Sequence, residues 1–348
     1  MSEQPIITSV YIERTRNNTW RIRARYSDGS RRQLDSGFTH EQAAREAAKQ
    51  YTTEQTVLLV GDDADDPDAD ADVIWNRVID EQKQRVRTTT TKRIILPAQP
   101  VAIAFLSDFH LGNPGTDYAS VKRDAQLVAE TDGMYAMFIG DGIDNWIIPK
   151  LAGLQRGQAV TFDEEWLLLE SWLSIVAHKL LVVVAGNHDN WTTKLAGIDR
   201  LRDLVKPINV LYHHAQVVFL LQIGDVVRTL CIRHKWRGNS IFNATHGLEV
   251  SWERMGVNYD WSIGGHTHID TVCRPFLRHG VRRHAILIGT YKLRDTYGVE
   301  SGYAPSHGSG SGAMVIHPDG RQWWFDRIDE AAMFVLYLRH TYQQQETA

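Results

Sequence analysis

Short apolar runs alternate with helical patterns along most of the chain, from about Ile94 onward. The runs have the length of β-strands, and the segments between them space their apolar positions as helices do. Such alternation is typical of an α/β core. We expect strands at Val101–Ser107, Met134–Gly140, Leu180–Ala185, Thr229–Arg233, Trp261–Gly264, His284–Gly289 and Ala313–His317, and helices at Tyr118–Glu130, Asp163–His178, Ile198–Val205 and His246–Met255.

Residues 1–57 have a pattern of their own and predict a small separate domain of three strands followed by one helix. Polar and glycine-containing turns separate the strands. Thr39 and Gln42 have the spacing of a capping box, which places the start of the helix. The expected elements are strands at Ser9–Arg16, Thr19–Tyr26 and Arg31–Asp35, and a helix at Glu41–Tyr51.

Residues 58–93 separate this domain from the rest of the chain. Seven aspartates and no basic residue fall within Gly61–Asp72, so this stretch repels itself and predicts an extended linker. An amphipathic helix over Val73–Arg87 is expected to follow, with Trp75, Val78 and Ile79 on one face. Residues 94–348 are then expected to form a second, larger domain.

Composition narrows the class of protein. The 348 residues carry a net charge of −4, so contact with nucleic acid requires a local basic surface. We find no apolar run near the ~18 residues of a membrane span and no N-terminal signal region. The two cysteines, Cys231 and Cys273, cannot form a disulfide framework, and a cytoplasmic location is the expectation.

Five polar motifs each follow the C-terminal end of a predicted strand, the edge where α/β sheets bind ligands. Each motif alone is weak evidence, because a Gly-Asp pair or a strand-end histidine is often only a turn residue. Together they supply aspartate, histidine and asparagine without cysteine, which suits two divalent cations better than structural zinc. The motifs are Asp108-Phe109-His110-Leu111-Gly112, Gly140-Asp141-Gly142-Ile143-Asp144-Asn145, Gly186-Asn187-His188-Asp189, His234, and Gly264-Gly265-His266-Thr267-His268.

This ordered series resembles the calcineurin-like metallophosphoesterase superfamily over roughly residues 94–327. The resemblance implies a β-sandwich flanked by helices in αββα layers, and a water activated between two divalent cations. It implies that His188 works on the substrate, and either Asp144 or Asp189 is expected to orient an imidazole. The implied ligands are Asp108, His110, Asp141 and His268 for one metal, and Asp141, Asn187, His234 and His266 for the other.

Two branches of the superfamily fit poorly. Protein serine/threonine phosphatases carry an arginine where this chain has Asn145 and a glutamate where it has Asp189, and purple acid phosphatases carry a tyrosine at the position of Asp144. The pattern is similar to the diesterase and nuclease branches. We therefore expect a metal-dependent phosphoric ester hydrolase, either a nuclease acting on nucleic acid or a phosphodiesterase or phosphatase acting on nucleotides or cyclic nucleotides. Mn²⁺ is the expected metal, with Zn²⁺, Fe²⁺ or Ni²⁺ as alternatives.

A third reading is a non-catalytic binding module, and the complete ligand set together with His188 argues against it. For the substrate, Lys235, Trp236 and Arg237 follow His234 and are candidates to clamp a phosphate and stack a base. The alternative for this stretch is a surface loop whose tryptophan is tucked into the core. The Gly- and Ser-rich segment 303–312 is either a lid or a simple loop.

The N-terminal domain supplies the local basic surface. Arg21, Arg23 and Arg25 alternate along one predicted strand and therefore share one face of the sheet, with Trp20, Ile22, Ala24 and Tyr26 on the other. A one-sided basic sheet suits phosphate backbones. The strand order is also similar to the small arm-type DNA-binding domains of phage integrases, which implies nucleic acid as a partner. The alternative is a solvated charged face.

Overall fold

The computed structural model describes residues 7–15, 17–27, 30–51, 57–62, 75, 78–79, 92–208, 210–238, 240, 242–255, 258–294 and 309–346. The chain divides into two compact units, one of residues 1–97 with 219–222 and the other of 98–218 with 223–348. Among the described residues no helix is both long and apolar enough to cross a membrane.

The first unit contains the predicted strands β1 (Ile7–Arg14), β2 (Trp20–Tyr26) and β3 (Arg31–Phe38), followed by α1 (Glu41–Ala48) and the short 3₁₀ helix Lys49–Tyr51. Two further strands, β4 (Val57–Asp62) and β5 (Lys92–Leu96), extend the sheet to the order β5-β4-β1-β2-β3. The sequence did not predict β4, because its residues directly precede and overlap the acidic run.

The prediction of a capping box at Thr39 and Gln42 is wrong. The residue that caps α1 is His40, and it makes no side-chain hydrogen bond to the helix. A real capping box occurs in the second unit, where Thr161 and Glu164 bond reciprocally at the start of α4 (Phe162–Val176). Of the helix expected at 73–87, only residues 75, 78 and 79 are described, and the rest lies outside the described residues.

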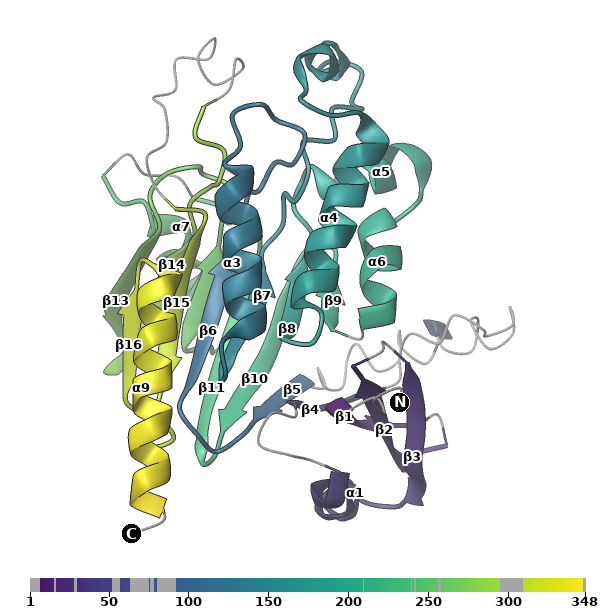
Figure 1. The fold of residues 1–348 in the computed structure, drawn as a ribbon, viewed down its shortest axis with the longest axis vertical. Coiled ribbons are helices and arrows are strands. Elements are labelled where there is room, and N and C mark those ends of the chain that lie inside the picture. Colours follow the sequence, from purple (N-terminus) through teal and green to yellow (C-terminus); the bar gives the residue numbers. More distant parts are fainter. Residues whose placement is uncertain are drawn as a thin grey trace, which may run out of the picture. The chain divides into compact units, whose positions relative to one another are not determined.

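Two sheets form the second unit (Figure 1). One has the order β16-β15-β6-β7-β8-β9, in which β6, β7, β8 and β9 are parallel. The other includes β13-β14-β12-β11, and β10 (Val217–Ile223) has residues in both units. The strands are β6 (Val101–Leu106), β7 (Met134–Phe138), β8 (Leu180–Val184), β9 (Leu211–His213), β11 (Val226–Ile232), β12 (Trp261–Gly264), β13 (Val272–Arg278), β14 (Val281–Leu287), β15 (Ser311–Ile316) and β16 (Gln322–Phe325).

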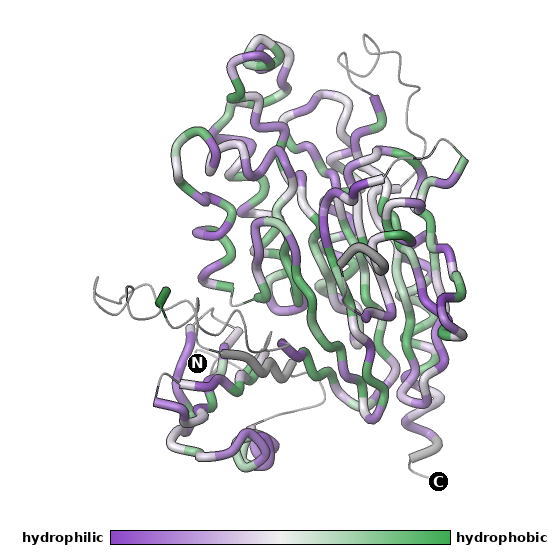
Figure 2. Tube along the Cα trace, turned by 180° about the vertical axis from the view of Figure 1, so that it is seen from behind, coloured by the Kyte–Doolittle hydropathy of each residue, from purple (hydrophilic) through white to green (hydrophobic). Residues whose placement is uncertain are grey.

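Central strands of both sheets are buried on both faces. Every residue of β6, β7, β8, β12 and β15 is buried. Figure 2 shows hydrophobic residues running along the strands of this unit. On one side α3 (Tyr118–Glu130), α4 and α9 (Ile328–Glu346) cover the first sheet. On the other side the sheets face each other, with Phe105 edge-on to Trp261 at 6.4 Å.

The second sheet carries α7 (His246–Met255), and its core includes Leu248, Tyr259 and Leu287. The predicted sandwich flanked by helices is therefore confirmed. Two short helices, α5 (Asp189–Ala196) and α6 (Arg200–Val205), follow β8. The sequence missed α5, α9, β9, β10, β13 and β16.

Candidate metal centre

All five motifs lie at C-terminal strand ends, as expected. Asp108 and Asp141 follow β6 and β7, which are adjacent parallel strands, and Asn187 follows β8. His234 and His266 follow β11 and β12, which are parallel neighbours in the other sheet. Since the two sheets face each other, their carboxyl ends bring these residues together.

The backbone of the centre is unusual. Asp108, His110, Asp141, His266 and His268 all have positive φ, between 49° and 75°. Left-handed backbone costs a residue other than glycine roughly 1–2 kcal/mol. Such strain is typical of functional sites, where the surrounding structure holds it in place.

The first cluster consists of Asp108, His110 and His268, whose ligand atoms could hold one metal ion. His268 Nε2 lies 3.1 Å from Asp108 Oδ1 and 3.0 Å from His110 Nε2. Asp108 and His110 are fully buried, and the His268 side chain is 31 % exposed. The cluster is therefore reachable from one side only through His268.

Asp141, His234 and His266 form the second cluster. His234 Nε2 lies 3.0 Å from Asp141 Oδ2, and the rings of His234 and His266 are 5.2 Å apart. Asp141 Oδ2 and His234 Nε2 face each other and are buried with no other hydrogen-bond partner among the described residues, and the buried Asn187 Oδ1 has none. Buried polar atoms are rarely left unpaired, so each one requires an explanation.

Asp141 lies between the two clusters. Its Oδ2 is 3.9 Å from His110 Nε2 in the first cluster and 3.0 Å from His234 Nε2 in the second. Asp108 Oδ1 has a similar but looser position, 3.7 Å from His110 Nε2 and 4.0 Å from His234 Nε2. The carboxylates of Asp108 and Asp141 therefore each lie within about 4 Å of a histidine from both clusters.

Two histidines are held in one tautomer. His234 Nδ1 lies 2.7 Å from the carbonyl oxygen of Ile139, which only accepts, so in the neutral ring Nδ1 carries the proton and Nε2 has the lone pair that a metal would use. His110 Nδ1 lies 2.7 Å from Asp144 Oδ1. Hydrogen bonds of this kind orient imidazoles for metal binding.

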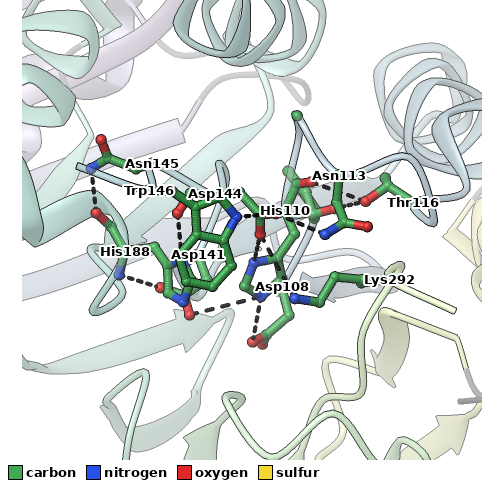
Figure 3. A network of polar contacts seen from close by, with 12 residues as sticks. Asp108, His110, Asn113, Thr116, Asp141, Asp144, Asn145, Trp146, His188 and Lys292 are labelled. Carbon is green, nitrogen blue, oxygen red and sulfur yellow. Dashed lines mark hydrogen bonds and ion pairs between the residues drawn. The ribbon is translucent and has the colours of Figure 1, made fainter. Parts of the chain in front are cut away.

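Asp144, not Asp189, orients an imidazole, which decides between the two alternatives. Besides His110, the Asp144 carboxylate accepts hydrogen bonds from Asn113 and Trp146 at 2.8 and 2.9 Å (Figure 3), and from Gln158 at 3.1 Å. Burial raises the pKa of Asp144, but the hydrogen bond and charge of His110, together with the charge of Lys292, outweigh it and hold the pKa well below its usual range. Four hydrogen bonds therefore hold the Asp144 carboxylate in place, and it in turn orients the His110 ring.

Asp189 performs a different task. Its two carboxylate oxygens accept the backbone N–H groups of Asp141, Gly142 and Gly186 at 2.7–3.0 Å. The loop after β7 is thus tied to the loop after β8. Burial, together with the charge of Asp141, raises the pKa of Asp189 to about 6.

His188 lies beside both clusters. Its Nδ1 is 2.5 Å from the carbonyl oxygen of Asp144, so Nε2 carries the lone pair. The ring packs 4.0 Å from that of Trp191 and edge-on to that of His110 at 4.8 Å. Burial lowers the pKa of His188 to about 4.

Cationic groups are favoured between the carboxylates. Burial lowers the pKa of His234, but the charges of Asp141 and Asp108 raise it by more, to about 10. His266, which is more exposed, has its pKa lowered to about 4 by burial and by the neighbouring His234. Positive charge is therefore stabilised beside Asp141, where a metal cation would place it.

The residues fit a binuclear metal site on three counts. Histidine nitrogens and carboxylate and amide oxygens are suitable donors for divalent cations. The unpaired atoms of Asp141, Asn187 and His234 all belong to residues assigned to one metal. Gly186 and Gly265 allow the loops to approach, because an added Cβ would collide with the carboxylates of Asp141 and Asp108 respectively.

The three substrate candidates after His234 are not equivalent. Trp236 is only 7 % exposed, and its indole N–H donates to the carbonyl oxygen of Ile263 at 2.9 Å. It packs in the core of the second sheet, so the core alternative holds for this residue and its ring cannot stack a base. Lys235 and Arg237 are exposed. Most of segment 303–312 lies outside the described residues.

In the first unit the structure agrees only in part with the basic face expected from Arg21, Arg23 and Arg25. Ile22 and Ala24 are buried, and Ile22 packs with Ala44 and Ala48 of α1. Arg21 and Arg23 both pair with Glu13 of β1, at 2.9 and 3.7 Å.

Arg25 shares the face of Arg21 and Arg23, as predicted, but it is only 7 % exposed, which corrects the expectation that it is available to nucleic acid. Its register partner is Ser9, and burial lowers its pKa while Tyr11 raises it. The sequence missed Glu13 because it lies on the preceding strand. A charged partner across two strands becomes visible only from their register.

One charged residue near the centre belongs to no motif. Lys292 follows β14 and is 8 % exposed, with its Nζ 3.7 Å from Asp144 Oδ1. The only sequence signal was its position a few residues past a predicted strand end. Strand-end position without a motif was too common to single it out.

No protein-family model and no curated protein sequence matches the chain. Solved structures do match, with low scores. Vacuolar protein sorting 29 from Cryptosporidium parvum is 16 % identical, with 65 % of this chain and 96 % of that chain covered and a TM-score of 0.34. Nuclease MPE from Pseudomonas putida is 15 % identical, with 64 % and 87 % covered and a TM-score of 0.30.

A third match is the calcineurin-like phosphoesterase YfkN from Bacillus subtilis, which is 12 % identical, with 71 % of this chain and 98 % of that chain covered and a TM-score of 0.33. At these scores the functional reasoning rests on the side chains of the centre. The ordered set of site residues that the strand ends bring together is the set in which the sequence resembles the calcineurin-like phosphoesterases.

Proposed function

We propose that this chain is a binuclear metal-dependent phosphoester hydrolase that cleaves phosphodiesters, with nucleic acid as its substrate class. One observation carries the proposal: the buried Asp141 Oδ2 lies between two ligand clusters, 3.9 Å from His110 Nε2 in the first and 3.0 Å from His234 Nε2 in the second. A bridging carboxylate between two such clusters is what a two-metal site requires.

The first metal would be held by Asp108, His110, Asp141 and His268, and the second by Asp141, Asn187, His234 and His266. Mn²⁺ is the proposed metal, because the donors are oxygen and imidazole nitrogen without sulfur. Two such cations supply Lewis-acid activation of water and neutralise the charge that develops on the phosphoryl oxygens.

The protein's own groups prepare this chemistry. Asp144 and the carbonyl oxygen of Ile139 fix the orientations of His110 and His234 before anything binds. His188 is anchored through Nδ1, so Nε2 is the atom that can meet the substrate. The resting ring is neutral with no proton on Nε2, so this atom would first take up a proton and then pass it to the leaving oxygen.

Small-molecule diesters remain the second candidate, and two observations favour them. Arg25 and Trp236 are both buried, which removes two of the six residues proposed to contact nucleic acid. Arg21 and Arg23 of the first unit, with Lys235 and Arg237, remain as proposed contacts to nucleic acid.

A metal-supplemented panel tests the proposal. The purified chain is loaded with Mn²⁺ and assayed with bis-p-nitrophenyl phosphate, p-nitrophenyl phosphate, cyclic nucleotides, single-stranded DNA and duplex DNA. We expect the diester to be cleaved faster than the monoester, and DNA to be cleaved. Cleavage of cyclic nucleotides with DNA left intact would move the assignment to the small-molecule candidate.

Asp141→Asn provides the matched variant. An amide replaces the carboxylate shared by both clusters, so both metals should bind more weakly and the rate should fall. Full metal occupancy with a normal rate in this variant would refute the two-metal assignment.

A further inference from the structure

Lys292 places an ammonium group beside the metal centre, where no motif assigns one. The residue is 8 % exposed, and its Nζ lies 3.7 Å from Asp144 Oδ1 and 5.9 Å from the centre of the Trp146 ring. Figure 3 shows the side chain extending toward His110. Burying an ammonium is costly, so a lysine in this position calls for a function.

The backbone around Lys292 is fixed to the loop that carries the first cluster. Thr290 Oγ1 and the Tyr291 N–H both donate to the carbonyl oxygen of Asp108, at 2.8 and 3.1 Å. On the other side, the Leu293 N–H donates to the carbonyl oxygen of Gly115 at 3.0 Å. The backbone on both sides of Lys292 is therefore hydrogen-bonded to the loop that begins at Asp108.

A second anchor fixes the neighbouring side chain. The Tyr291 hydroxyl donates to Asp124 Oδ2 at 2.7 Å, and the ring packs edge-on to Phe109 at 5.4 Å. Lys292 also forms an isolated bridge with Thr116. Supporting contacts of this density are typical of residues whose position matters to chemistry.

Asp144 does not need Lys292 to complete its hydrogen bonds. Its carboxylate already accepts from His110, Asn113, Trp146 and Gln158 at 2.7–3.1 Å. The 3.7 Å separation from Lys292 Nζ is beyond hydrogen-bond range. Lys292 therefore adds positive charge to this side of the centre and forms an ion pair with Asp144, but it donates none of the four hydrogen bonds that hold this carboxylate against His110.

We propose that Lys292 binds a non-bridging oxygen of the substrate phosphate on the His110 side of the centre. The inference rests on the proposed function, since a phosphoester must occupy the site. An ammonium on a flexible stem suits this task, because it acts as a compact charge with three donors. Lys292 would then be a substrate-binding residue that the metal-ligand motifs do not include.

The test compares Lys292→Met, Lys292→Gln and Lys292→Arg in the full chain loaded with Mn²⁺. The matched control is Lys122→Met, which removes an exposed lysine from α3. Three quantities are measured: metal per chain, binding of inorganic phosphate by calorimetry, and kcat and KM for bis-p-nitrophenyl phosphate. Thermal unfolding midpoints identify any variant that fails to fold, and Lys292→Gln serves if Lys292→Met does.

The neutral variants should bind phosphate roughly tenfold more weakly with metal content unchanged, as expected for the loss of one charge-assisted contact. Lys292→Arg should recover most of the affinity, and Lys122→Met should match the wild type. Unchanged phosphate affinity in the neutral variants overturns the proposal, even if hydrolysis is intact.

Loss of metal in the neutral variants also overturns it, because Lys292 would then act through the ligands. If the wild type binds phosphate through Lys292 but cleaves no ester, then the proposed function fails and the assignment of Lys292 stands. If the wild type binds neither metal nor phosphate, then both fail.

Discussion

Glu165 of α4 should make the stability of the metal-free protein depend on pH in an unusual direction. The side chain is fully buried, and Oε2 accepts the Asn145 N–H at 2.8 Å. Burial, with a smaller effect of the charge of Asp144, raises its pKa from 4.5 to about 7. Glu165 is therefore mostly protonated in the folded chain at a pH where it is ionised in the unfolded chain.

The hydrogen bonds of Glu165 act in the opposite direction to burial. The Asn145 N–H donates to Oε2 at 2.8 Å and the Gln155 side chain donates to Oε1 at 3.4 Å, and both favour the ionised carboxylate. Burial outweighs them, so the neutral carboxyl is favoured.

The sign and size follow from the pKa difference. The stability that a neutral Glu165 contributes is full below pH 4.5, is lost between 4.5 and about 7, and is absent at higher pH. At 1.36 kcal/mol per unit, the loss amounts to at most about 3 kcal/mol. Glu165→Gln introduces a neutral group of the same shape that does not titrate, so this loss should disappear.

The assay is denaturant unfolding in EDTA at pH 5, 6, 7 and 8, for the wild type, Glu165→Gln and the control Glu170→Gln. Glu170 is an exposed carboxylate on the same helix. The free energy of unfolding of Glu165→Gln minus that of the wild type should rise by about 1–3 kcal/mol between pH 5 and pH 8. A difference that stays constant within about 0.5 kcal/mol across this range would refute the reasoning.

Three further predictions concern other parts of the chain. His188→Asn should lower kcat by roughly 10²–10⁴-fold with metal content unchanged, and a parallel loss of metal in elemental analysis would make His188 a ligand. The double change of Arg21 and Arg23 to Ala should weaken DNA binding and flatten its salt dependence in a filter or fluorescence titration, and unaltered affinity from low to moderate salt would exclude the first unit as the nucleic-acid contact. Thr161→Ala should lower the free energy of unfolding by about 1 kcal/mol, since it removes the capping box of α4, and no measurable change would show that the cap contributes nothing.

The arrangement of the centre could be predicted because its rule is simple. Parallel strands end at one edge, and the residues after β6, β7, β8, β11 and β12 are therefore neighbours whatever the details of packing. Helices with strong apolar periodicity were also found at their observed bounds, as for Tyr118–Glu130 and His246–Met255.

Other features depend on contacts between distant segments. Glu13 pairs with Arg21 only through strand register, and Lys292 reaches the centre only because its loop is bonded to that of Asp108. Edge strands such as β13 and β16 are half-exposed and lack a continuous apolar run, so no pattern indicated them. The burial of Trp236 was an open alternative because an aromatic residue after a strand end fits either place.

The left-handed backbone at the centre has a consequence for engineering this protein. Glycine adopts positive φ without steric cost, so a substitution to glycine would relieve backbone strain at five positions: Asp108, His110, Asp141, His266 and His268. A screen that rewards only thermal stability would therefore accept substitutions at the positions that bear the chemistry. Libraries built to stabilise the chain should keep these five codons fixed, because thermal stability gained there would come from removing candidate metal ligands.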